Sequence, residues 1–257
     1  MRAIAPTGTF LSPIDFCKKL LFGNSADYKE SFERTILFEF DTASQIQFCS
    51  SGTEALFHAL CLIKKQTDRP FILLSSYTCP DIAYAVIRAG FKIRLFDLEF
   101  VTRKPIIDEV DLLDCAAIIF SNLYGLPDVI PDFVYQSDCL IIDDACQSFF
   151  SFDDFGKRVG TRGDVGILSF NRGKSFPSFG GGAVVFSGKF LEKSGSEVLA
   201  LKSTKQSLFS ELIILIKSII FPILEKPFFY GIVKSLPFTG IGETKIKNFS
   251  IDKKYWQ

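Results

Sequence analysis

The sequence predicts an α/β protein in which a mostly parallel sheet is sandwiched by helices. Two observations support this fold class. Short apolar runs alternate with helix-forming segments over roughly 100 residues, and this alternation is typical of a parallel sheet covered on both faces. Small or polar residues directly follow several of the apolar runs, and ligands of such sheets bind beyond the carboxyl ends of the strands. We therefore expect a ligand site at that edge of the sheet.

The chain begins with a mixed segment, and the first regular unit follows it. Residues 1–44 carry helical signals at 13–22 and 26–38, and we expect them to form an N-terminal arm. Residues 45–49 then form a predicted strand, and a turn leads into a helix over residues 54–64. Strand, turn and helix together give the first β/α unit.

The same alternation continues to about residue 186. Further strands are expected at residues 71–74, 92–98, 116–120, 139–143, 165–170 and 183–186. Further helices are expected at residues 80–90, 108–113, 128–135, 189–201 and 208–221. We therefore divide the chain into the arm at 1–44, a large ligand-binding domain at 45–200 and an apolar helical segment at 201–257.

Composition excludes several classes of partner and site. The 257 residues carry 29 basic and 29 acidic side chains, so no polyanion-binding surface and no nucleic-acid partner are expected. Seven cysteines without a CxxC pair indicate a reducing, cytoplasmic location with neither disulfides nor a zinc site. The only histidine, His58, lies on a predicted apolar helix, and a structural role is favoured over a catalytic triad or a metal site.

The most apolar segment, Leu208 to Ile223, is interrupted by Glu211, Lys217 and Pro222. It is shorter than the ~20 apolar residues that a membrane helix needs, so no spanning segment is expected. A helix packed on the large domain or in a dimer interface is favoured over a helix lying in the membrane interface. The first residues lack the apolar core of a signal peptide.

Lys174 is the residue that we expect to carry the chemistry. It lies in a loop rich in glycine and proline between two predicted strands, where functional residues concentrate. A solvated surface lysine is the alternative, because most lysines are exposed. Other residues decide between the two interpretations.

Asp144 directly follows a buried apolar run and is itself preceded by Asp143. Two carboxylates at a strand end are costly unless they are paired, and one use for such a group is to keep a pyridinium nitrogen protonated. The alternative is a helix N-cap. Ser51, Gly52 and Thr53 at a helix start suit a phosphate, although the same residues are also the commonest helix starters.

In their order along the chain, these residues resemble the DegT/DnrJ/EryC1/StrS family of sugar aminotransferases, which are pyridoxal-phosphate enzymes of fold type I. The resemblance covers roughly residues 45–187. The matching motifs are Ser51-Gly52-Thr53-Glu54-Ala55-Leu56, Ala85-Val86 to Ala89-Gly90, Leu123-Tyr124-Gly125, Asp143-Asp144-Ala145-Cys146-Gln147, Gly160 to Asp164, Ser169-Phe170 to Lys174, and Gly181-Gly182-Ala183-Val184. An ordered set of motifs is more specific than any one of them.

The resemblance implies a role for each matching residue. Lys174 would form the Schiff base with pyridoxal 5′-phosphate, Asp144 would pair with the pyridine nitrogen, and Gln147 would contact the ring or its 3-hydroxyl. The phosphate would be held by Gly52, Thr53 and Ser169. With these partners, a cofactor lysine is favoured over a surface lysine at position 174.

The chain departs from the family pattern at three places. Cys79 stands where relatives usually carry an aromatic residue that stacks on the cofactor, so either Tyr77 or another ring takes its place or the stacking is weaker. Asn122 stands where a histidine often precedes the Leu-Tyr-Gly motif. Relatives also continue into a smaller C-terminal domain that helps to build the substrate site and the dimer, and we expect this domain to be largely missing here.

The resemblance implies a cytoplasmic homodimer that aminates a nucleotide-linked keto sugar, with glutamate as the amino donor, for polysaccharide or aminosugar biosynthesis. Lys174 favours this activity over that of the family's dehydratases, which carry histidine at the corresponding place. The alternative is a truncated, catalytically silent fold that acts as an interaction module or is a gene remnant.

Overall fold

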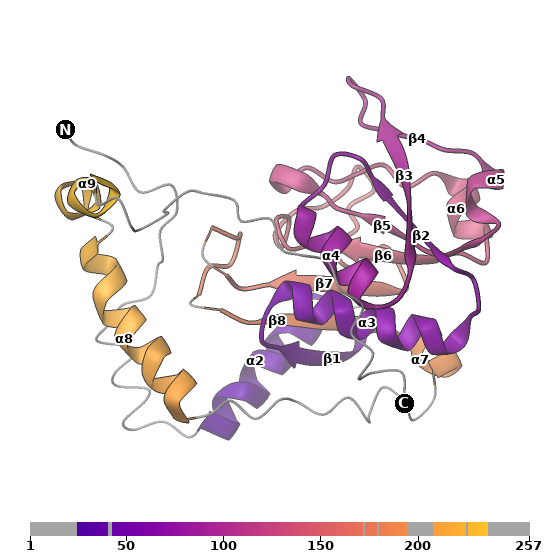
Figure 1. The fold of residues 1–257 in the computed structure, drawn as a ribbon. Coiled ribbons are helices and arrows are strands. Elements are labelled where there is room, and N and C mark those ends of the chain that lie inside the picture. Colours follow the sequence, from indigo (N-terminus) through magenta and orange to yellow (C-terminus); the bar gives the residue numbers. More distant parts are fainter. Residues whose placement is uncertain are drawn as a thin grey trace.

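The fold is built around one eight-stranded sheet, seen in a computed structural model that describes residues 25–40, 43–171, 173–178, 180–194, 208–224 and 226–235 (Figure 1). The strand order is β1-β8-β7-β6-β5-β2-β3-β4. The strands are β1 (Ala43–Cys49), β2 (Phe71–Ser75), β3 (Lys92–Leu98), β4 (Pro105–Ile106), β5 (Cys115–Phe120), β6 (Leu140–Asp144), β7 (Val165–Ser169) and β8 (Gly182–Ser187).

The five central strands β7, β6, β5, β2 and β3 are parallel. β8 is antiparallel to both of its neighbours, β7 and β1, and β4 pairs antiparallel with β3 at the other edge. The mostly parallel sheet is therefore confirmed. Its parallel strands all end at the same edge, and this edge carries the candidate site.

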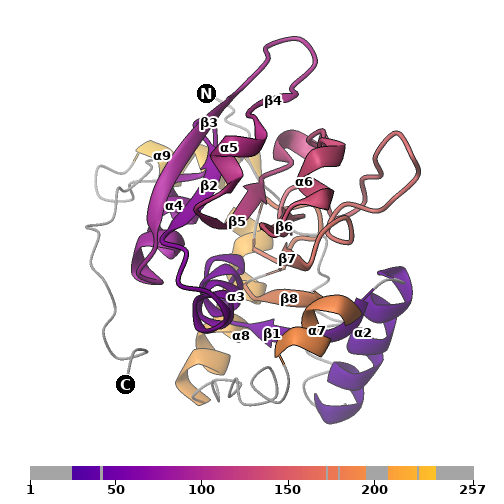
Figure 2. The ribbon, with the colours of Figure 1, turned by 90° about the vertical axis from the view of Figure 1, so that its right-hand side faces the viewer.

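The helices follow the strands in the expected alternation. They are α2 (Ser25–Glu39), α3 (Gly52–Gln66), α4 (Pro80–Arg88), α5 (Glu109–Leu112), the 3-10 turn η1 (Leu123–Gly125), α6 (Asp132–Gln136), α7 (Gly188–Ser194), α8 (Leu208–Leu224) and α9 (Pro227–Ser235). Figure 2 shows α4 and α6 on opposite sides of the central strands.

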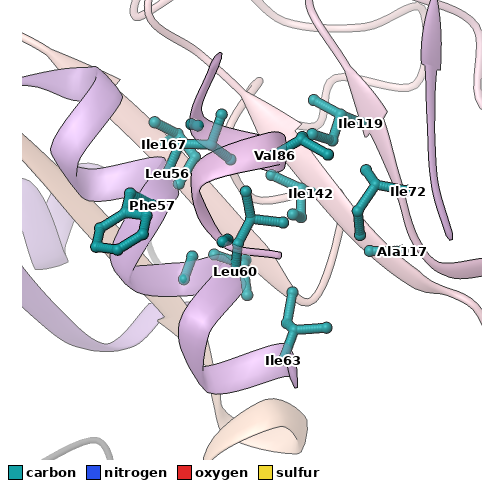
Figure 3. Close-up of a cluster of buried hydrophobic side chains, with 14 of the residues drawn as sticks. Leu56, Phe57, Leu60, Ile63, Ile72, Val86, Ala117, Ile119, Ile142 and Ile167 are labelled. Atoms are coloured by element: carbon teal, nitrogen blue, oxygen red, sulfur yellow. The ribbon is translucent and has the colours of Figure 1, made fainter. Parts of the chain in front are cut away.

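Alternate strand residues contact helices on opposite faces of the sheet. On one face, apolar side chains of α3 and α4 pack on the sheet, as Figure 3 shows for Leu60 and Ile142. On the other face, Ile141 packs with Leu112 of α5 and Val134 of α6. A third cluster joins α2 to β1, β7 and β8. This two-sided burial explains why the inner strands β2, β5 and β7 are almost continuously apolar.

Local sequence accounts for the start of α3, the helix that approaches the site. The Ser51 side chain caps the helix by accepting a hydrogen bond from the backbone N–H of Glu54, at 3.1 Å. Leu56, Leu60 and Ile63 then recur on the buried face, at the spacing of an amphipathic helix. The N-terminal peptide groups of α3 therefore lie at the carboxyl ends of the strands.

Several element boundaries differ from the prediction. The helix expected at 128–135 begins only at Asp132, because Pro131 has extended backbone angles and occupies the N-cap. The two-residue strand β4 and the helix α9 were not predicted. The expected helix at 13–22 lies outside the described residues, as does the second half of the one expected at 189–201.

The apolar segment forms α8, which contacts α9. Pro222 lies inside α8, and five of its isoleucines are exposed in this chain. Among the described helices, none combines the length and the apolar character that crossing a membrane requires.

Candidate active site

A cavity of about 90 Å³ lies beside the N-terminus of α3 and the ends of β6 and β7. Seven of the eight predicted site residues line it: Gly52, Thr53, Cys79, Asp144, Gln147, Ser169 and Lys174. Sequence reasoning did not assign the other lining residues: Leu56, Asp81, Ile82, Ser121, Leu123, Cys146 and Asn171. The fold therefore gathers residues from five separate segments of the chain around one small volume.

Close backbone approach builds the end of the cavity next to α3. Gly182 pairs with Cys49 of β1 on one side and with Ser169 of β7 on the other. A Cβ atom on Gly182 would come within 2.5 Å of the Gly52 nitrogen, and one on Gly52 would come within 2.8 Å of the Ser169 Cβ. Only glycine therefore fits at either position. This packing places the Ser169 hydroxyl beside the first turn of a helix, where backbone N–H groups attract anions.

Asp144 supplies a buried carboxylate to the site. It is the last residue of β6 and only 5% exposed, and its Oδ1 accepts a hydrogen bond from the Cys146 N–H at 2.9 Å. Burial raises the pKa of Asp144 above its ordinary value, although the Cys146 hydrogen bonds and the positive charge of Lys174 act in the opposite direction. A second cation in the cavity would therefore stabilise the ionised carboxylate.

Lys174 is partly buried and lines the cavity, so the structure does not place it as a freely solvated lysine. Gly173 has a φ of 76°, and the Lys174 N–H donates to the carbonyl oxygen of Asn171 at 3.2 Å. The next residue, Ser175, donates its hydroxyl to the carbonyl oxygen of Gln147 at 2.8 Å. This bond ties the lysine loop to the turn that follows Asp144.

An aromatic cluster packs around Phe176 of the same loop. The Phe176 ring stacks on Phe149 with centroids 5.6 Å apart and on Phe32 of α2 with centroids 5.9 Å apart. Phe170, which begins the loop, meets the Phe176 ring edge-on. The part of the arm that forms α2 therefore helps to hold the lysine loop.

Tyr77 is the one predicted site residue that does not line the cavity. Its ring is 60% exposed, and its hydroxyl lies 2.8 Å from the hydroxyl of Tyr124. Tyr124 in turn donates its backbone N–H to Gln147 Oε1 at 3.1 Å. Cys79 does line the cavity, so a thiol stands at this part of its wall. Stacking by Tyr77 stays a prediction.

Asp143 and Asn122 lie just behind the cavity and are completely buried. Asp143 forms an ion pair with Arg162, a residue for which the sequence assigned no role, with 2.7 Å between Nη2 and Oδ1. The only sequence signal for this partner was the expectation that two carboxylates at a strand end need a cation. Asn122 does not reach the cavity, although its neighbours Ser121 and Leu123 do.

His58 forms a separate cluster with Glu54, Arg88 and Cys49 near the start of α3. Its Nε2 lies 3.3 Å from Glu54 Oε1, and its Nδ1 lies 3.7 Å from the Cys49 thiol. The hydrogen bond with His58 and the ion pair with Arg88 lower the pKa of Glu54 to about 2, against the effect of burial. These contacts fit the structural role expected of His58. Across the described residues, no three His, Cys, Asp or Glu side chains are grouped to hold a metal ion.

Comparisons with known proteins show what the chain and its fold are similar to. The chain is 27% identical over 178 residues to a dTDP-4-amino-4,6-dideoxy-D-glucose transaminase from Shigella dysenteriae, covering 67% of this chain and 47% of that protein. Its fold is similar to 3-amino-5-hydroxybenzoic acid synthase, with a TM-score of 0.65, 20% identity and coverage of 81% and 58% of the two chains. It is also similar to the sugar aminotransferase CalS13 from Micromonospora echinospora, with a TM-score of 0.64, 16% identity and coverage of 82% and 61%.

The family assignment comes from the sequence as a whole. The chain spans about half the length of the transaminase it matches. A family model matches residues 18–206, which include every predicted site residue. The chain belongs to the DegT/DnrJ/EryC1/StrS aminotransferase family.

Proposed function

We propose that this chain binds pyridoxal 5′-phosphate and transfers an amino group to a nucleotide-linked keto sugar. The observation that carries the proposal is that Lys174 and Asp144 line the same cavity, although 30 positions apart in the sequence. Family membership supports it, because the family is one of aminotransferases.

The donor set fits the three chemical groups of the cofactor. The amine of Lys174 suits the aldehyde, and the buried Asp144 carboxylate suits a protonated ring nitrogen. The Ser169 hydroxyl and the N-terminal N–H groups of α3 suit the phosphate. Gly52 and Gly182 leave room in this last region because they carry no Cβ atom. Each residue type is therefore matched to a group that it can bind.

The proposed reaction assigns distinct tasks to the side chains. When bound, pyridoxal phosphate withdraws electrons from the carbon that carries the amino group. Lys174 takes a proton from that carbon at its Nζ atom and returns a proton at the next stage. Asp144 would stay ionised and orient the ring, while Gln147 would contact the ring or its 3-hydroxyl.

The substrate assignment follows the relatives. The curated relative is a transaminase of a dTDP-linked sugar, and one structural neighbour is a GDP-4-keto-6-deoxymannose-3-dehydratase. Lys174 favours transamination over dehydration in this chain. We include in the proposal glutamate as the donor, a homodimer, a cytoplasmic location and a role in polysaccharide or aminosugar biosynthesis.

A visible spectrum of the purified protein tests the cofactor assignment. Adding pyridoxal phosphate is expected to produce an absorption band of the lysine-bound cofactor, and L-glutamate is expected to bleach it. The band should be absent from Lys174→Ala and present in the matched control Lys104→Ala, which removes an exposed lysine.

The outcomes separate the two functions considered. No band at saturating cofactor would overturn the enzyme proposal. A band that no amino donor bleaches would favour the alternative, a catalytically silent fold that keeps its cofactor site.

A further inference from the structure

The two adjacent carboxylates at the end of β6 have opposite environments. Asp144 lines the cavity, whereas Asp143 is completely buried behind it. Asp143 accepts five hydrogen bonds, at 2.7 Å from Gly160 N, 2.8 Å from Asn122 Nδ2, and 3.1, 3.0 and 2.7 Å from N, Nε and Nη2 of Arg162. A carboxylate with this many donors is held in one position.

Asn122 joins this ion pair to the end of β6. Its Nδ2 group lies 2.8 Å from Asp143 Oδ1 and 3.0 Å from the carbonyl oxygen of Asp144. Its Oδ1 accepts from Arg162 Nη2 at 2.6 Å and from the Asp128 N–H at 2.9 Å. The φ of Asn122 is 45°, a left-handed conformation that asparagine adopts more readily than most residues. The amide therefore links the ends of β5 and β6.

Asp144 has few partners of its own. Hydrogen bonds to its carboxylate come from the N–H and the thiol of Cys146, two positions along the chain. The direction of its side chain therefore depends on where the backbone at the end of β6 is held. Asn122 contacts that backbone directly through the Asp144 carbonyl oxygen.

We propose that Arg162, Asp143 and Asn122 form a positioning unit that aims the Asp144 carboxylate at the ring nitrogen of the bound cofactor. This inference rests on the proposed function. None of the three residues lines the cavity, so each acts through Asp144 rather than on the cofactor.

Charge gives Arg162 a second task in this unit. A buried Asp143 without a cation would repel the neighbouring Asp144 carboxylate and favour its protonated form. The guanidinium group neutralises Asp143 without lining the cavity, and it also donates to the carbonyl oxygen of Asp128 at 2.8 Å. Asp144 can then keep its charge for the ring nitrogen.

The test compares pyridoxal phosphate with its 1-deaza analogue, in which carbon replaces the ring nitrogen. Calorimetric titration of the wild-type chain should show about tenfold tighter binding of pyridoxal phosphate than of the analogue, because only pyridoxal phosphate can form the charge-assisted hydrogen bond with Asp144. Asp144→Asn should remove this preference by weakening the binding of pyridoxal phosphate alone.

Arg162→Met and Asn122→Ala are expected to lose the same preference while still binding the analogue. Damage to the fold would weaken the binding of both ligands equally. The ratio of the two affinities therefore separates a positioning role from a loss of stability. Arg158→Met is the matched control, because Arg158 pairs with Glu39 and makes no bond to this unit. The preference of Arg158→Met for pyridoxal phosphate over the analogue should remain at about tenfold.

Asn122→Ala keeps the test valid if Arg162→Met does not fold. A preference retained in Asn122→Ala, or in a folded Arg162→Met, would overturn the inference. Equal affinity of the wild-type chain for the two ligands would overturn it as well but would leave cofactor binding intact. Failure of the wild-type chain to bind either ligand would overturn the proposed function itself.

Discussion

The two ends of the cavity are built by different physical means. At the helix end, which we define as Gly52, Thr53 and Ser169, the site is made by backbone groups brought together through glycine contacts. At the carboxylate end, which we define as Asp144 and Lys174, it is made by charged side chains in a buried environment.

This difference determines what each end tolerates. A helix N-terminus keeps its partial charge at every pH at which the protein is folded, so the helix end is sensitive to added volume and insensitive to protonation. The carboxylate end has the opposite sensitivities, because its charges respond to burial and to neighbouring ions. Substitutions at the two ends should therefore give different signatures.

The largest effect is expected from Gly182→Ala at the helix end. The added Cβ would lie 2.5 Å from backbone atoms of Ser51 and Gly52, which cannot move without shifting α3. We expect a loss of about 3 kcal/mol in the free energy of unfolding, measured by urea denaturation, together with loss of pyridoxal phosphate binding.

Gly156→Ala is the control for this substitution. No atom lies within 4 Å of the added Cβ, but φ is 78°, so only a backbone cost of about 1 kcal/mol is expected. Equal stability of the two variants would show that the helix end is not closely packed.

The sequence predicted the helix end more completely than the carboxylate end. Gly52, Thr53 and Ser169 belong to short motifs whose local geometry follows from caps, turns and strand ends. The parallel strands were predictable for a similar reason, since each is a short apolar run between turn signals. In both cases the sequence signal that predicts the local structure lies within a few neighbouring residues.

The residues that hold Asp143, just behind the carboxylate end, were not predictable in the same way. Arg162 is 19 positions from Asp143 and Asn122 is 21, and only the folded sheet brings them together. Tyr77 is a further case: its hydroxyl lies 2.8 Å from that of Tyr124 in an exposed position, and its stacking on the cofactor stays a prediction. Sequence spacing does not specify such side-chain directions.

A smaller effect, of opposite sign, is expected from Asp144→Asn at the carboxylate end. The pKa of Asp144 is raised in the folded chain, so its ionised form destabilises the cofactor-free protein above the ordinary aspartate range. The variant should therefore melt a few degrees higher than the wild type at neutral pH.

The pH dependence identifies the cause of that gain. As the pH falls through the raised pKa of Asp144 toward its ordinary value, the folded wild-type carboxyl becomes protonated and the difference in melting temperature should shrink. Thermal melts of the cofactor-free proteins between neutral pH and about pH 4 measure it. A difference that stays constant over this range would assign the gain to packing rather than to charge.

The smallest effect is expected from Ser51→Ala, which removes the cap of α3 without adding volume. Loss of the hydrogen bond to the Glu54 N–H should cost about 1 kcal/mol in urea denaturation. Fraying of the first turn should also weaken pyridoxal phosphate binding by roughly threefold, since the N–H groups of that turn face the proposed phosphate.

Asp108→Ala is the control for this substitution. It removes the cap of α5, which does not border the cavity, and should lower stability while leaving the affinity for pyridoxal phosphate unchanged. If the two variants bind the cofactor equally well, phosphate binding at the helix end does not depend on an ordered first turn. The Ser169 hydroxyl would then be the principal hydrogen-bond donor to the phosphate.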